Sequence, residues 1–177
     1  GWRPSLFGMG LGRFPEAYFW GTTVGRSPGT YRYESEDGNV FLRLGSGSPI
    51  YIDQIVALRP HRKYVLSLDL RSSSSSRAGD FGVPICEKRL VQSFRCESLP
   101  LRLQDGVDTW QHHEIAFDSK EVGSGPWYSR RPVTLALHSS GGIVDIDNVR
   151  LIGEDGRDLE ANGGFDHGND RWLFTVD

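Results

Sequence analysis

One short stretch of the chain combines two aromatic side chains with two arginines. Trp127 and Tyr128 are followed by Arg130 and Arg131, in a loop where nothing forces the rings to be buried. A flat ring packs against the apolar face of a ligand, and a guanidinium group donates paired hydrogen bonds to a polar edge. A sugar ring presents both kinds of surface. His138 lies on the polar face of the strand that follows, so we expect all five side chains at one sheet edge, although solvent exposure alone would explain the histidine.

A second polar group falls on outward positions of neighbouring predicted strands. Arg43, Asp69 and Arg71 would form a polar concave face for the same ligand, or surface ion pairs that contribute little stability. His112 and His113 are adjacent on one strand, so their side chains point to opposite faces and cannot share a metal ion.

The two cysteines predict a disulfide bond. Cys86 and Cys96 lie symmetrically about the centre of a predicted hairpin with arms at 81–86 and 93–99, which would place them directly opposite each other. Opposed Cβ atoms lie about 4.5–5.5 Å apart, close enough for a bridge after a small adjustment. A structural disulfide implies an oxidising, extracytoplasmic compartment. The alternative is a pair of free thiols in a cytosolic protein.

The sequence contains none of the common catalytic motifs that we sought: the G-x-S-x-G elbow, H-E-x-x-H and a phosphate-binding loop. The formal net charge of −3 gives no basic surface for nucleic acid or anionic lipid. No apolar run approaches the roughly 20 residues of a membrane helix, so we expect no membrane insertion by this segment. A binding or structural role is therefore favoured over an enzyme.

The stretch from Val133 to Leu151 sets the expected architecture. It predicts a hairpin of two strands joined by a Gly-Gly turn. In the second strand the apolar alternation slips by one residue at Asp147-Asn148, which is the pattern that a β-bulge produces. An acidic residue is therefore expected where the backbone is irregular.

Short alternating segments separated by turns fill the rest of the chain, and helical patterns are nearly absent. Further strands are expected at 17–24, 31–33, 39–44, 50–58, 63–71, 108–118 and 173–176. We therefore predict an all-β fold, a two-sheet antiparallel jelly-roll β-sandwich. Residues 1–16 would form an N-terminal arm, and 17–177 a single domain whose C-terminal segment, 159–177, completes the sandwich.

Four segments carry a resemblance to a known family. GNVFLRL, IYIDQIVALRPHRKYVLSLDLRS, TWQHHEIAFD and VTLALHSSGGIVDIDNVRL, in that order, resemble jelly-roll carbohydrate-binding modules with a galactose-binding-domain-like fold. The resemblance implies a non-catalytic module that binds a polysaccharide or envelope glycan outside the cytoplasm. The alternative is a structural or protein-interaction domain of a bacterial envelope protein, built on the same sandwich.

The C-terminal motif is displaced relative to that family. The family's opening motif corresponds here to Asn162 through Trp172, near the C-terminus. Either this segment fills the slot of the first strand, as in a circular permutation, or it begins a second module. We favour the first because 173–176 has the composition of a strand. The tail also resembles extracytoplasmic segments of VanZ-like bacterial envelope proteins, which would make the chain part of a larger membrane-anchored or multidomain protein.

The resemblance also implies a structural calcium ion. Asp147 matches the acid of the family's closing motif and Asp166 that of its opening motif. The acidic turn at 34–37 would add oxygen ligands. Asn148 stands where the family often has a second acid, and two solvated turn aspartates are the alternative. Trp110 and Trp172 match positions that pack inside the fold in this family.

Overall fold

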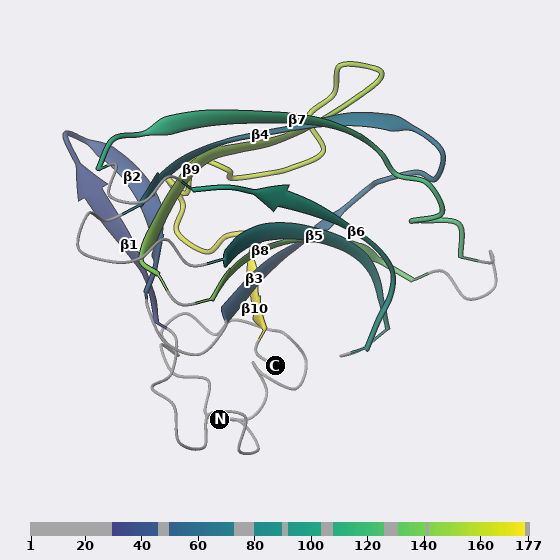
Figure 1. Ribbon diagram of the computed structural model, residues 1–177, viewed down its shortest axis with the longest axis horizontal. Coiled ribbons are helices and arrows are strands. Elements are labelled where there is room, and N and C mark those ends of the chain that lie inside the picture. Colours follow the sequence, from purple (N-terminus) through teal and green to yellow (C-terminus); the bar gives the residue numbers. More distant parts are fainter. Residues whose placement is uncertain are drawn as a thin grey trace.

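The computed structural model describes residues 30–45, 50–72, 80–89, 92–103, 108–125, 131–140 and 142–175. These residues form two five-stranded antiparallel sheets that lie one above the other, and they contain no helix (Figure 1). The predicted all-β sandwich is confirmed. In the described part of the chain, no helix has the length and apolar character needed to cross a membrane.

The first sheet, called here the β9 sheet, has the strand order β1-β2-β9-β4-β7. Its strands are β1 (Tyr31–Glu36), β2 (Asn39–Leu44), β9 (Val144–Gly153), β4 (Lys63–Ser72) and β7 (Gln111–Asp118). The clean alternation of β4 is reproduced, because Leu66, Leu68 and Leu70 are fully buried while the residues between them face outward.

The second sheet, called here the β8 sheet, has the strand order β10-β3-β8-β5-β6. Its strands are β10 (Leu173–Thr175), β3 (Ile50–Val56), β8 (Val133–Ser140), β5 (Asp80–Arg89) and β6 (Gln92–Leu101). β5 and β8 bend into an arch whose hollow side faces away from the β9 sheet (Figure 1). The outer face of this sheet is therefore concave.

The predicted hairpin of β8 and β9 is wrong, since the two strands lie in different sheets. Each bears an apolar face, and these faces meet across the core: Leu135 and Leu137 on one side, Val144 and Ile146 on the other, all fully buried. A period-two pattern with a glycine turn fits a hairpin and a crossover between stacked sheets equally well.

The predicted bulge in β9 is confirmed. Two residues of β9, Asn148 and Val149, lie opposite one residue of β4, Leu68. Asn148 has a φ of 50°, in the left-handed region that asparagine tolerates better than most residues. The bulge shifts the alternation by one, so that Asp147 before it faces outward and Leu151 after it points into the core.

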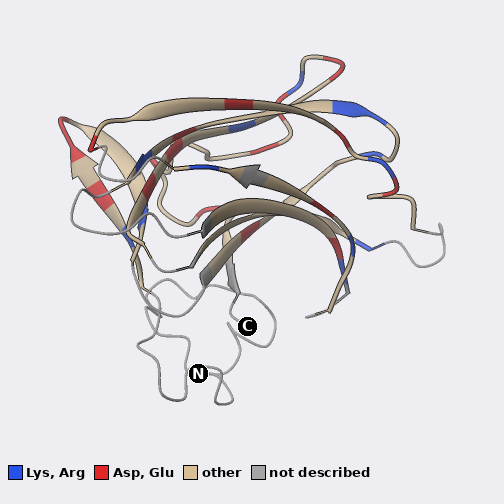
Figure 2. Cartoon of the chain, in the orientation of Figure 1, with Lys and Arg blue, Asp and Glu red and all other residues tan. Residues whose placement is uncertain are grey.

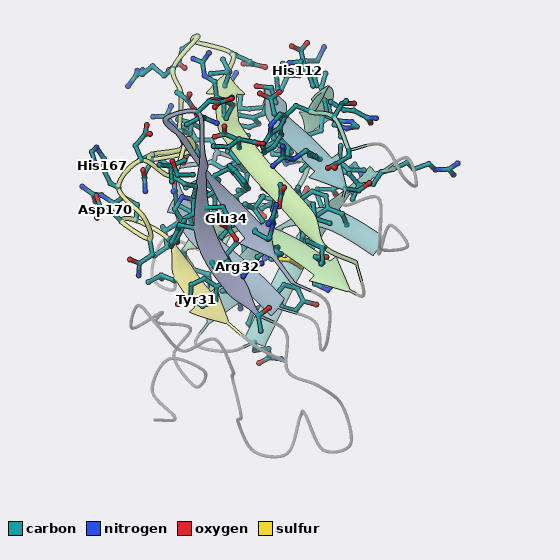
Figure 3. All side chains as sticks on the ribbon, turned by 90° about the vertical axis from the view of Figure 1, so that its left-hand side faces the viewer. Tyr31, Arg32, Glu34, His112, His167 and Asp170 are labelled. Carbon is teal, nitrogen blue, oxygen red and sulfur yellow. A yellow bond between two sulfur atoms is a disulfide. The ribbon has the colours of Figure 1, made fainter. Side chains whose placement is uncertain are left out.

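The C-terminal segment links the two sheets. Val149 donates its backbone N–H to the carbonyl oxygen of Gly163, and β10 pairs with β3 at the edge of the β8 sheet. A Cβ at Gly163 would lie 1.9 Å from the carbonyl oxygen of Val149, so only glycine permits this approach. Trp172 is 1% exposed, which confirms its expected place in the core. The loop between Gly163 and Trp172 carries His167 and Asp170 beside β1 (Figure 3).

The predicted disulfide is also confirmed. β5 and β6 form the expected hairpin, Cys86 and Cys96 are partners in its register, and their sulfur atoms are bonded with the Cα atoms 4.2 Å apart. The strand predicted at 17–24 and the arm at 1–16 lie outside the described residues.

Candidate functional site

The structure separates two residues that the sequence grouped together. Arg131 immediately precedes β8, whereas His138 lies near the other end of that strand. Seven residues of extended chain span about 20 Å, because a strand rises by about 3.3 Å per residue. Arg131 therefore lies at one end of β8 and His138 near the other, so these two do not share a sheet edge. Trp127, Tyr128 and Arg130 lie outside the described residues.

His138 instead stacks on an aromatic ring that the sequence analysis missed. Tyr51 of β3 is its register partner, and the two rings lie 4.3 Å apart with an interplanar angle of 22°. Both residues are half-buried on the concave face of the β8 sheet. The signal was available in IYIDQIV, where Tyr51, Asp53 and Ile55 share one face of the strand.

A buried ion pair lies on the same face. Asp53 follows Tyr51 on β3 by two residues, or about 7 Å, and its Oδ2 accepts a 2.7 Å hydrogen bond from the Nζ of Lys88 on β5. Asp53 is only 2% exposed. The concave face thus places a ring pair beside charged hydrogen-bonding groups, all held by strands in the middle of the sheet.

The outer face of the β9 sheet carries a network of paired charges. Arg43 and Arg71, from neighbours of β9, both donate to the carboxylate of Asp145, with Nη2–Oδ2 and Nε–Oδ2 distances of 2.8 and 2.9 Å. Asp145 is 3% exposed. Arg43 also lies 3.4 Å from Glu34, and Arg71 lies 2.6 Å from Glu36. Acidic and basic segments accordingly lie close together near β1 and β9 (Figure 2).

Two aromatic rings are covered by these guanidinium groups. The Arg71 guanidinium carbon lies 4.6 Å from the centre of the Trp110 ring and 5.0 Å from that of Phe41. Phe41 is 2% exposed as a result. Trp110 therefore packs on the outside of the sheet, where arginine occupies its face. Arg43 and Arg71 were predicted to help form a polar ligand-binding face, but in the structure their guanidinium groups bind side chains of the protein itself.

Asp69 is engaged in a separate set of contacts on that face. Its Oδ1 lies 2.7 Å from the Nδ1 of His112, and its Oδ2 accepts a 2.8 Å hydrogen bond from the side chain of Asn148. His113 follows His112 on β7, and its side chain points to the inner face of the sheet, as the alternation of the strand predicted. Its buried Nε2 has no hydrogen-bond partner among the described residues. Burial lowers the pKa of its imidazole, and the charge of His112 lowers it further.

The two aspartates predicted to hold calcium approach each other. A Cβ built on Gly164 would lie 3.4 Å from Asp166 Oδ2 and 3.9 Å from Asp147 Oδ1, so both carboxylates flank this glycine. Asp147 is 2% exposed and accepts hydrogen bonds of 2.7 Å from the Asn39 side chain and from the backbone of Asn148. Burial raises the pKa of Asp147, and the charges of Asp69 and Asp166 raise it further.

The acidic turn at 34–37 turns its carboxylates elsewhere, since Glu34 and Glu36 pair with arginines. Among the residues that the structure describes, no group of three or more His, Cys, Asp or Glu side chains is arranged to hold a metal ion. A calcium ion here would depend on Asp147, Asp166 and neighbouring backbone carbonyl groups.

Comparisons with known proteins support the fold. No protein-family model and no curated protein matches the sequence. Among solved structures, the chain is similar to "PbXyn10C CBM APO", with a TM-score of 0.51, 18% identity and coverage of 80% of this chain and 85% of that one. It is also similar to "Family 16 Carbohydrate Binding Module-2", with a TM-score of 0.49, 17% identity and coverage of 71% and 85%.

A third similar structure is a cyclase from Fischerella sp. TAU, with a TM-score of 0.48, 18% identity and coverage of 74% and 76%. Carbohydrate-binding modules and an enzyme thus appear among the structural neighbours of this sandwich. At these identities the likeness to the first structure shows a shared fold, and a function has to be argued from the site.

Proposed function

We propose that this chain is a non-catalytic carbohydrate-binding module that holds its glycan on the concave face of the β8 sheet. The observation that carries the proposal is the stacked pair of Tyr51 and His138, with ring centres 4.3 Å apart. A sugar ring packs its C–H face against such a flat surface and directs its hydroxyl groups sideways. The ion pair of Asp53 and Lys88 lies on the same face of the sheet.

The Cys86–Cys96 bond supports a place outside the cytoplasm, because structural disulfides persist in oxidising compartments. In that setting the ligand would be a polysaccharide or an envelope glycan. The membership of a larger membrane-anchored or multidomain protein, and the resemblance of the tail to VanZ-like envelope proteins, stay predictions.

A structural or protein-interaction domain is the second candidate. The observation that favours it is the burial of central positions on the concave face: Asp53, Ala136 and Thr134 are 2%, 3% and 6% exposed. The half-buried ring pair at one end of the face is therefore more accessible to a glycan than these central positions.

We further propose that Asp147 and Asp166 hold a structural calcium ion. The groups that donate to Asp147, a side-chain amide and a backbone N–H, are both uncharged, and its carboxylate lies near a second one. The two negative charges repel each other. A divalent cation that prefers oxygen ligands would offset this repulsion and hold the C-terminal segment against β9.

A glycan array followed by titration tests the carbohydrate proposal. Tyr51→Ala and His138→Ala should each weaken binding of the best glycan roughly tenfold or more, because truncating a ring at the centre of an interface is costly. His112→Ala is the matched control, since this histidine is exposed on the outer face of the β9 sheet, and it should change the affinity by less than about twofold.

If the array finds no glycan, the scaffold candidate replaces the carbohydrate one. If His138→Ala and Tyr51→Ala bind as tightly as the unchanged chain, the site lies elsewhere on the sandwich.

A further inference from the structure

A cavity of about 670 Å³ opens where β3 ends and β8 begins. Its volume is within the range of about 300–1,000 Å³ that is typical of small-ligand sites. One wall comes from Ile55 to Pro60 and the other from the loop at 123–125 and from Arg131 to Val133. It therefore lies at the opposite end of β8 from His138.

Among the described residues that line the cavity, the charged side chains are both basic. Arg59 and Arg131 line the cavity, and no acidic residue is found among the described residues that do so. Ile55, which is 58% exposed, and two prolines supply an apolar wall. Because the whole chain is acidic, with a net charge of −3, this concentration of positive charge is local.

The guanidinium group of Arg131 is only partly used. Its carbon lies 3.7 Å from the centre of the Phe94 ring, and its Nη1 lies 3.5 Å from Glu87 Oε2, at the limit for a hydrogen bond. Its Nε is buried and has no hydrogen-bond partner among the described residues. A buried donor without an acceptor is unfavourable, so an oxygen acceptor bound in the cavity would be stabilised.

The carboxylate behind the cavity does not cancel its charge. Glu87 is fully buried and already accepts hydrogen bonds from the backbone of Gly123, at 2.9 Å, and from Arg95, at 3.2 Å. Two arginines thus share one carboxylate. Arg59 is exposed, and its side chain makes no ion pair within the described part of the chain. Excess positive charge is therefore left at the mouth of the cavity.

The cavity continues the concave face. Ile55 lies on the same side of β3 as Tyr51, four residues or about 13 Å away. We propose that this cavity binds the anionic group, a carboxylate or a sulfate ester, of an acidic saccharide whose next units lie along β3 toward Tyr51. The inference rests on the proposed function and specifies its ligand class. Guanidinium groups bind such anions through paired hydrogen bonds, while Ile55 and the prolines contact the C–H surface of the ring.

Two pairs of probes test this ligand class. Trigalacturonate is compared with its methyl ester, which keeps the rings and loses the charge, and a sulfated galactan oligomer is compared with its desulfated form. Titrations at low ionic strength keep the electrostatic contribution measurable. At least one acidic probe should bind roughly tenfold or more tightly than its neutral partner, as expected for charge-assisted hydrogen bonds. The pair that shows the preference tells carboxylate from sulfate.

Arg59→Gln is the decisive variant, because its side chain makes no ion pair with any residue that the structure describes. It should remove most of the preference for the acidic probe, whereas Arg32→Gln, an equal loss of charge on β1 of the other sheet, should leave it within about twofold. Arg131→Lys keeps the charge beside Glu87 but loses the planar fork, and it should also reduce the preference while the melting curve stays close to that of the unchanged chain.

Equal affinity for acidic and neutral probes, or an acidic preference that survives Arg59→Gln, overturns the inference. If neutral glycans still bind and depend on Tyr51, the proposed function stands without it. If no saccharide binds at all, both are overturned.

Discussion

At the scale of single residues, Asp145 joins two arginines on the outer face of the β9 sheet. It lies 3% exposed between Arg43 and Arg71, and both arginines place their guanidinium groups over the ring of Phe41. One carboxylate therefore binds two guanidinium groups and holds them against an aromatic ring. The Asp145 carboxylate therefore contributes both to the charge balance and to the packing of this face.

Asp145→Asn should destabilise the fold by about 3 kcal/mol, because removing one partner leaves two partly buried cations without their shared carboxylate. Chemical denaturation of the variant measures this directly. Arg32→Gln removes one partner of Glu34, which still pairs with Arg43, and should therefore destabilise the fold by less than about 0.5 kcal/mol. A similar loss from both variants would show that the network contributes no more than a surface ion pair.

Glu160 is expected to make the stability of the fold depend on pH. Its Oε1 accepts a hydrogen bond from the buried side chain of Gln54, at 3.3 Å, and burial raises its pKa to about 7. The folded chain therefore keeps this proton at a pH where the unfolded chain has released it. Stability due to this group is fully present at low pH and falls as the pH rises from the ordinary glutamate value toward 7.

Glu160→Gln should remove that part of the pH dependence and raise the melting temperature above pH 7. Melting curves between pH 4 and 8 compare it with the unchanged chain and with Glu114→Gln, an exposed residue of β7. If the Glu160 variant and the unchanged chain lose stability in parallel over this range, the carboxyl group titrates normally.

At the scale of elements, the β5–β6 hairpin is closed by its disulfide between residues ten positions apart. Reduction should lower the free energy of unfolding by roughly 2–4 kcal/mol, because the bridge restricts the unfolded chain. Denaturation with and without reductant measures the loss. The unreduced, denatured protein should show no titratable thiol, and two titratable thiols would contradict the bridge and the argument for an oxidising compartment.

The contact between the C-terminal segment and β9 should depend on calcium. A chelator should lower the melting temperature, because an ion that binds only the folded state stabilises it by mass action. Asp147→Asn should abolish the chelator effect, and Asp155→Asn, in an exposed turn, should keep it. Metal analysis of the purified protein accompanies the melts, and a metal-free protein whose melting curve ignores added calcium would contradict the site.

The elements differ in how far their sequences determine their place. β2 and β4 could be predicted to within one residue of their ends, and the bulge of β9 was visible as a slip of phase, because period-two burial is a local signal. The assignment of β8 and β9 to different sheets could not be predicted, because strand pairing depends on contacts across the core. The face on which Tyr51 lies could be predicted from the alternation of IYIDQIV, but its stacking on His138 could not, because that contact depends on which strand pairs with β3.

At the scale of the whole molecule, the two outer faces differ in what they leave for a ligand. On the β9 sheet, arginines, carboxylates and aromatic rings satisfy one another. On the β8 sheet, the hollow face carries a ring pair at one end and a basic cavity at the other. The curvature seen in Figure 1 and this difference in chemistry are the reasons for proposing that a glycan binds to the β8 sheet.

The most direct test of this account is to map where a glycan binds. Backbone amide resonances of the protein are recorded during titration with the tightest glycan from the array. The account predicts that the perturbed signals cluster on β3 and β8 around Tyr51 and His138. Perturbations confined to the β9 sheet around Arg43, Arg71 and Asp145, or no glycan that perturbs any signal, would contradict it.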